Sequence, residues 1–286
     1  MPSVIRDFPT RHTPALDAHA REWEAAGRPA APPARPAATV MLVRDREGSQ
    51  GVAPGVEVFM LLRVATMAFA PNTMVFPGGG VDRRDGAELP WAGPPVHAWA
   101  ARLDSDEQLT REILVAAVRE VFEECGVLFA SRLEDGRLVY TRSERWQALR
   151  QRLVAREASL GEVLRDEELL LRTDLLRAHA HWMTPEIEPR QFDARIFAAV
   201  MPEGATADGE TSEAQHSGWF RPEEVLAERE AGRAILMPPT VVCLEDLARA
   251  HSAAEFFAQE PVIRLIRPVL ARNDAGEMVT RAQLPR

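Results

Sequence analysis

One short stretch, residues 115–127, restricts the possible folds of this chain more than any other. It carries three carboxylates, Glu120, Glu123 and Glu124. At about 100° per residue, a helix places all three within roughly a 100° arc of one face. The opposite face would then be an apolar stripe of Leu114, Val118, Val121 and Cys125. Gly126 suits the left-handed position that ends a helix.

Carboxylates gathered on one helix face repel one another, and a purely structural helix has no need of them. Mg²⁺ takes oxygen ligands and bridges to substrate phosphates, so a hard divalent cation would account for the cluster. The alternative is an acidic helix face in solvent. The neighbouring residues favour the metal.

Residues 119–127 resemble the second half of the Nudix box. The family pattern is Gly, five residues, Glu, seven residues, Arg-Glu, an aliphatic residue, one residue, Glu-Glu, one residue, Gly and an aliphatic residue. Every fixed position of the second half is matched here. Upstream, residues 76–82 contain three consecutive glycines and look like the glycine-rich entry to the family's loop.

The two halves of the box are not at the family's spacing. Gly80 lies far ahead of Arg119, so residues 83–104 read as an insertion inside the box. Eight residues before Arg119, where the pattern has its first Glu, stands Arg111, and Glu112 is its out-of-register neighbour.

The resemblance implies an α/β fold, a Nudix α/β/α sandwich with a mixed sheet, plus an inserted helical region. We expect residues 1–36 to form an N-terminal segment with a Pro/Ala linker, and residues 37–286 to form the Nudix domain. Its insertions would lie at about 83–104 and 143–180, and its long helix at 105–125.

Local patterns predict the other elements. Strands are expected at 39–43, 56–62, 73–76, 190–200 and 218–220, and helices at 14–26, 143–177, 222 onward, 240–250 and 253–259. Residues 28–38 should be an extended linker, and residues 85–99 and 208–217 should be loops. The arginines of the helical insert are expected in solvent: Arg150, Arg152, Arg156 and Arg165.

The resemblance also implies a site. Glu120, Glu123 and Glu124 would hold Mg²⁺ (or Mn²⁺), which would activate a water for hydrolysis of a diphosphate. Arg119 would orient a box glutamate, while Gly79 and Gly80 would offer backbone to the metal or the phosphates. One of the three glutamates or a more distant carboxylate would take the proton of the water.

Further candidates lie outside the box. Glu213 precedes a predicted strand, where related enzymes sometimes place an extra carboxylate, and we include it as a catalytic candidate; a surface glutamate is the alternative. Arg63 and Arg195 on predicted strands are candidates for substrate binding, or else structural ion pairs. His216 is a weaker candidate base. His179 and His181 are not expected to bind zinc, since no Cys or third His lies nearby.

Three further segments, residues 182–186, 192–197 and 238–240, resemble the branch that includes peroxisomal coenzyme A diphosphatases. That branch implies hydrolysis of coenzyme A or acyl-CoA to 3′,5′-ADP and (acyl)phosphopantetheine. ADP-ribose or another nucleotide sugar is the alternative substrate. A non-catalytic Nudix-fold module that binds a nucleotide is the alternative function.

Composition limits the partners. The formal net charge of -9 argues against a nucleic-acid surface. No run of about 18 apolar residues suggests a membrane span. With only two cysteines, Cys125 and Cys243, a disulfide framework is excluded and a reducing cytoplasm is the expected location. The expected partner is a small nucleoside diphosphate derivative, and a homodimer is allowed.

Overall fold

The centre of the molecule is a mixed sheet. The computed structural model describes residues 3–48, 54–64, 70–209 and 214–285. The strand order is β11-β3-β2-β10-β9-β12, with β4 beside β3 and β5 beside β2. The bounds are β2 (Arg35–Arg46), β3 (Gly55–Arg63), β4 (Met74–Val75), β5 (Gly78–Gly80), β9 (Arg177–Met183), β10 (Phe192–Val200), β11 (Ala214–Phe220) and β12 (Leu265–Ile266). Strand β10 is parallel to β2 and antiparallel to β9.

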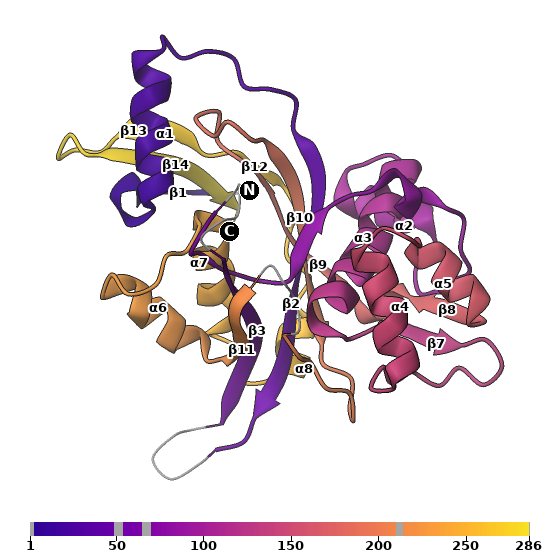
Figure 1. The fold of residues 1–286 in the computed structure, drawn as a ribbon. Coiled ribbons are helices and arrows are strands. Elements are labelled where there is room, and N and C mark those ends of the chain that lie inside the picture. Colours follow the sequence, from indigo (N-terminus) through magenta and orange to yellow (C-terminus); the bar gives the residue numbers. More distant parts are fainter. Residues whose placement is uncertain (1–2, 49–53, 65–69, 210–213, 286) are drawn as a thin grey trace.

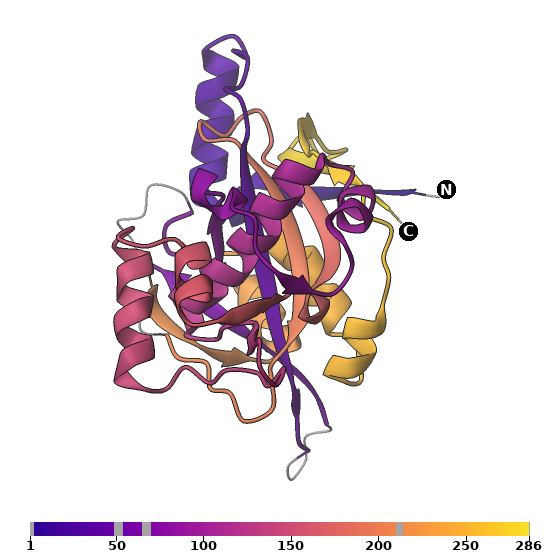
Figure 2. The same cartoon turned by 90° about the vertical axis from the view of Figure 1, so that its right-hand side faces the viewer.

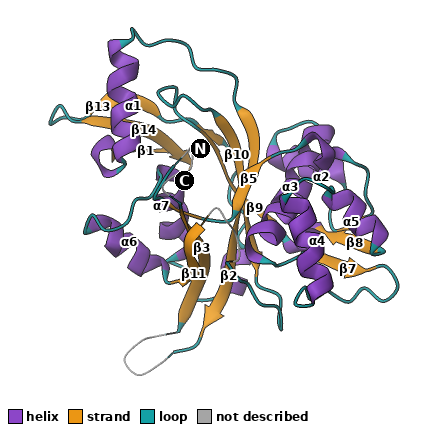
Figure 3. Cartoon of the chain, in the orientation of Figure 1, coloured by secondary structure: helices purple, strands orange, loops and turns teal. Residues whose placement is uncertain are grey.

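Helices cover both faces of this sheet (Figures 1 and 3). The helices are α1 (Pro14–Ala25), α2 (Val96–Leu103), α3 (Glu107–Cys125), α4 (Glu144–Val154), α5 (Leu160–Asp166), α6 (Pro222–Glu230), α7 (Pro238–Leu247) and α8 (Ala253–Ala258). Side chains of β2 alternate between two buried clusters: Val40 packs with α3, while Met41 packs with α7. The expected α/β/α sandwich is confirmed. Among the described residues, no helix is both long and apolar enough to cross a membrane.

Two small sheets flank the central one. One joins β6 (Trp91–Ala92), β8 (Leu169–Arg172) and β7 (Ala130–Arg132). The other joins β1 (Ser3–Pro9), β14 (Met278–Pro285) and β13 (Val269–Arg272). Because β1 pairs antiparallel with β14, the two ends of the chain lie side by side (Figures 1 and 2).

Helix α3 follows the sequence prediction closely. The Asp106 side chain caps its start, accepting a 2.8 Å hydrogen bond from the Leu109 N–H. Gly126 ends it with φ 69°, in the left-handed region. The predicted apolar stripe is buried at Leu114, Val118, Val121 and Cys125. The helix therefore holds its box residues rigidly against the sheet.

Four local predictions were wrong, one of them the loop at 208–217, because β11 already begins at Ala214. Residues 85–99 are not all loop, because α2 begins at Val96 and the Trp99 ring packs edge-on against Phe197, with ring centres 6.2 Å apart. The helical insert ends at Asp166, and the leucine-rich run after it forms β8 with alternating burial. The expected linker 28–38 is already strand from Arg35.

Candidate active site

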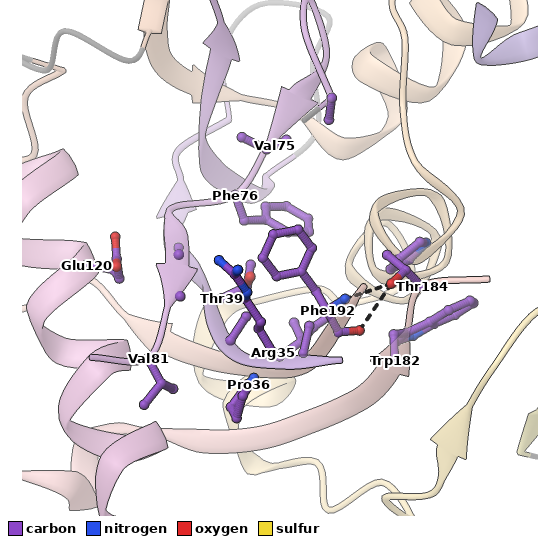
Figure 4. A pocket seen from close by; sticks show the side chains of 18 of the residues that line it. Arg35, Pro36, Thr39, Val75, Phe76, Val81, Glu120, Trp182, Thr184 and Phe192 are labelled. Atoms are coloured by element: carbon purple, nitrogen blue, oxygen red, sulfur yellow. Dashed lines mark hydrogen bonds between the residues drawn. The ribbon is translucent and has the colours of Figure 1, made fainter. Parts of the chain in front are cut away.

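A cavity of about 820 Å³ opens where β5 meets the middle of α3. Its acidic wall carries the three box glutamates, Glu120, Glu123 and Glu124. The remaining walls come from β2, β9, β10, the start of α7 and the segment between β4 and β5. They contribute Arg35, Trp182, Phe192 and Phe76 (Figure 4), and Pro238. Residues far apart in sequence thus converge around β5 (Gly78–Gly80), which we call the glycine strand.

Arg119 links the elements of the acidic wall. Its guanidinium donates to both oxygens of Asp85, at 2.9 and 3.0 Å, and to the Gly80 carbonyl at 2.9 Å. It also lies 2.7 Å from Glu120 Oε1 and 3.4 Å from the Glu123 carboxylate. Burial acts to lower the pKa of Arg119, but the Asp85 hydrogen bonds and the surrounding carboxylates outweigh it and raise that pKa above its usual value. Arg119 therefore stays charged and fixes the glycine strand to α3.

Asp85 was missed by the sequence analysis. Its side chain is 1% exposed, and it also accepts a 2.8 Å hydrogen bond from the Asp82 N–H. Arg111 stands eight residues before Arg119, where the family pattern has its first Glu. Its guanidinium carbon lies 5.4 Å from the centre of the Trp91 ring, over the ring face. Counting forward from the glycine of the box would have found Asp85, because five residues separate Gly79 from Asp85, as in the family pattern. The segment 83–104 therefore contributes to the site, contrary to its reading as a plain insertion.

Two glycines shape the contact between β5 and α3. The Gly78 N–H donates a 2.7 Å hydrogen bond to Glu124 Oε2, which anchors that carboxylate. A Cβ on Gly79 would lie 2.5 Å from Glu120 Oε1, so a larger residue there would push the Glu120 carboxylate aside. A Cβ on Gly80 would meet nothing within 4 Å. Of the two glycines predicted for the site, Gly79 is thus the one under steric constraint.

Arg150 secures the far end of the same helix. Its side chain is 1% exposed, contrary to the prediction that it lies in solvent. It donates to the Glu123 carbonyl at 2.9 Å and to Asp208 Oδ1 at 2.7 Å. A cation at a helix C-terminus is favoured by the exposed carbonyls and the helix dipole. The insert helix α4 thereby supports the turn that carries the glutamates.

The box glutamates suit a divalent cation in their chemistry. The side chains of Glu120 and Glu123 are 12% and 15% exposed, and Glu124 is 6% exposed, all on the cavity wall. Partly buried carboxylate oxygens are ligands that Mg²⁺ and Mn²⁺ accept. Within the described ranges, no three His, Cys, Asp or Glu side chains are already gathered as a metal cluster. Arg119 lies between Glu120 and Glu123, so binding would draw these carboxylates off the guanidinium.

The other predicted residues fall in different places. Arg63 lines the cavity. Arg195 does not: it is 3% exposed and pairs with Asp193 at 2.5 Å, which also contacts His181. Glu213 lies outside the described residues. His216 is exposed on β11 and is not among the residues that line the cavity.

A glutamate helix packed on a glycine strand, inside a mixed sheet between helices, defines a Nudix-type fold. A NUDIX hydrolase structure from Alicyclobacillus acidocaldarius superposes with TM-score 0.65 at 23% identity, covering 80% of this chain and 98% of that one. No family model matches the chain.

Two curated proteins are similar in sequence. A Caenorhabditis elegans protein named nudix hydrolase 7 is 31% identical over 194 residues, covering 67% of this chain and 56% of that protein. Acyl-coenzyme A diphosphatase NUDT19 of Xenopus laevis is 22% identical over 220 residues, covering 64% of this chain and 57% of its own length. The chain thus spans little more than half the length of these relatives. It belongs to the Nudix hydrolase superfamily.

Proposed function

We propose that this protein is a metal-dependent diphosphatase that cleaves coenzyme A or acyl-CoA into 3′,5′-ADP and (acyl)phosphopantetheine. One observation carries the proposal. Glu120, Glu123 and Glu124 lie on one wall of a cavity large enough for a nucleotide, against the backbone of β5. Carboxylates that line an open cavity suit an ion that is shared with phosphate oxygens.

The bound ion would neutralise the diphosphate oxygens and lower the pKa of the attacking water. The chain's own residues set up the acidic wall. Asp85 fixes Arg119, which holds Glu120 and Glu123 in place before a ligand arrives. Gly78 holds Glu124 through its N–H. Glu124 is thus already positioned for a ligand, while Glu120 and Glu123 would exchange their contact with Arg119 for the bound ion.

The substrate assignment rests on the walls of the cavity and on one relative. The segments that resemble the coenzyme A diphosphatase branch reach this cavity, through Trp182, Thr184, Phe192 and Pro238. The Thr184 hydroxyl accepts a 2.7 Å hydrogen bond from the Phe192 N–H and donates to the Phe192 carbonyl at 3.4 Å (Figure 4), and the Thr184 N–H donates to that carbonyl at 3.0 Å. The Xenopus laevis relative is named as an acyl-coenzyme A diphosphatase. These segments would hold the part of the substrate beyond the diphosphate.

The test is a substrate screen. Purified protein is incubated with coenzyme A, acetyl-CoA and ADP-ribose, with Mg²⁺, Mn²⁺ or a chelator, and the products are identified by mass spectrometry. We expect 3′,5′-ADP from both coenzyme A compounds and no product with chelator. A kcat/KM for ADP-ribose at least tenfold above that for coenzyme A, equivalent to about 1.4 kcal/mol in transition-state binding, would make ADP-ribose the proposed substrate instead. Binding without hydrolysis of any compound would favour a non-catalytic module.

Location and assembly stay predictions from the sequence. Cys125 and Cys243 are free and buried, as a reducing cytoplasm allows. A homodimer remains a prediction that size-exclusion chromatography with light scattering would test.

A further inference from the structure

Two arginines that are close to Phe192 in strand register or in sequence line the cavity together with it. Arg35 on β2 is paired in register with Phe192 on β10, and Arg190 precedes Phe192 by two residues. The Arg35 N–H also donates to the carbonyl of Gln191, at 2.9 Å. All three side chains line the cavity. We call Arg35, Arg190 and Phe192 the arginine end of the cavity.

The two arginines differ from their counterparts at the acidic wall. There, Arg119 is paired with Asp85 and Arg84 with Asp82. Arg35 and Arg190 are both exposed, and neither guanidinium has a hydrogen bond or ion pair within the described ranges. Two neighbouring cations without carboxylates, in a chain of net charge -9, form a local site for an anion. Guanidinium groups bind phosphate through two parallel hydrogen bonds.

The arginine end lies at nucleotide range from the acidic wall. On β2, Thr39 pairs with Gly78, the residue that holds Glu124, and Ala37 pairs with Gly80. Arg35 is four residues from Thr39 on the same strand, about 13 Å at about 3.3 Å per residue. An extended arginine side chain spans much of that distance, so one nucleotide can reach both ends.

Charge decides which half of the substrate belongs here. Apart from the diphosphate, coenzyme A has a neutral pantetheine arm and an adenosine with a 3′-phosphate. We propose that the arginine end binds the 3′-phosphoadenosine half, with Arg35 and Arg190 on the 3′-phosphate and the Phe192 ring against the base. A base stacks on an aromatic ring for about 1–3 kcal/mol. The neutral arm would lie toward Leu153, Val154 and Ala158, which line the cavity from the side of α4.

This proposal rests on the proposed function, so its first test measures binding alone. Isothermal titration calorimetry with Mg²⁺ compares 3′,5′-ADP with 5′-AMP, which lacks the 3′-phosphate. The variants are Arg35→Gln and Arg190→Gln, and the control is Arg264→Gln, an exposed arginine that does not line the cavity. We expect the wild type and the control to bind 3′,5′-ADP at least tenfold more tightly than 5′-AMP. Both cavity variants should lose most of that preference.

The proposal is overturned if the wild type shows no preference, or if both cavity variants keep it. A kinetic arm separates this result from the proposed function, by comparing coenzyme A with 3′-dephospho-coenzyme A. Equal kcat/KM values for these two compounds in the wild type would overturn the arginine end but leave the diphosphatase intact. A wild type that hydrolyses neither compound would refute the diphosphatase, while a 3′-phosphate preference lost in Arg35→Gln would still support the phosphate site.

Discussion

At the scale of single residues, Asp85 is the carboxylate on which the acidic wall depends. Asp85→Asn would leave the Arg119 guanidinium, 11% exposed, without its bidentate partner. Removing one member of a buried ion pair costs about 3–5 kcal/mol, and Glu120 would keep the loss near 3 kcal/mol. Urea denaturation would measure this. Arg111→Glu, which restores the glutamate at the position counted back from Arg119, should not rescue Asp85→Asn, because Arg111 lies over Trp91. A rescue would contradict the assignment.

The box glutamates give a second prediction at this scale. Glu123→Gln and Glu124→Gln keep the side-chain volume and should change the free energy of unfolding little. Each removes a charge from the cation site, which costs several kcal/mol of transition-state stabilisation, or roughly a hundredfold or more in kcat. Activity and Mn²⁺ affinity would both be measured. Glu112→Gln is the matched control, because Glu112 lies on the same helix but bonds Gln108 and does not line the cavity. Wild-type rates in both box variants would remove these residues from the ligand set.

The sequence predicted the residues of the site better than their partners. Glu120, Glu123 and Glu124 fall on one wall because a regular helix fixes their relative directions once its bounds are known. Asp85 and Arg150 could not be assigned in the same way. Asp85 could be found only by counting forward from Gly79, and the burial of Arg150 arises from long-range pairing with Asp208, which no local pattern encodes.

At the scale of elements, β5 offers a matched pair of substitutions. Gly79→Ala would place a Cβ 2.5 Å from Glu120 Oε1, and that flexible side chain would have to move. We expect a near-normal melting temperature with a rate about a hundredfold lower, since a displacement of about 1 Å in a catalytic group can have that effect. Gly80→Ala should keep both the melting temperature and the rate of the wild type, because its Cβ would have no atom within 4 Å. Equal rates in the two variants would show that Glu120 has no part in catalysis.

Elements with strong local signals were predicted, and those defined by pairing were not. Helix α3 had apolar periodicity, a capping residue and a terminal glycine. Strand β8 lies in a leucine-rich run that suits helix and strand equally, and its pairing with β7 and β6 decided the outcome. Helix α2 was obscured by the prolines that precede it, of which Pro95 occupies its N-cap.

At the scale of the whole molecule, the two ends of the chain join the domain through β1 and β14. Their pairing runs from Ser3 with Pro285 to Pro9 with Val279. The Phe8 side chain enters the buried cluster shared with β2 and α7. Contacts between residues so distant in sequence leave no periodic trace, so a separate segment 1–36 was the natural expectation from composition. We propose that this segment folds with the domain.

Phe8 and Ile5 together test that proposal. Phe8 is 3% exposed and Ile5 is 68% exposed, although both lie on β1. If the N-terminal strand is part of one cooperative unit, Phe8→Ala should lower the free energy of unfolding by about 3–5 kcal/mol in a single urea transition. Ile5→Ala should change it by less than about 0.5 kcal/mol. The two proteins would be compared by circular dichroism for helix loss and by tryptophan fluorescence. A small effect of Phe8→Ala, or a separate early transition, would mean that residues 1–36 form an appendage whose loss leaves the glutamate helix and its cavity intact.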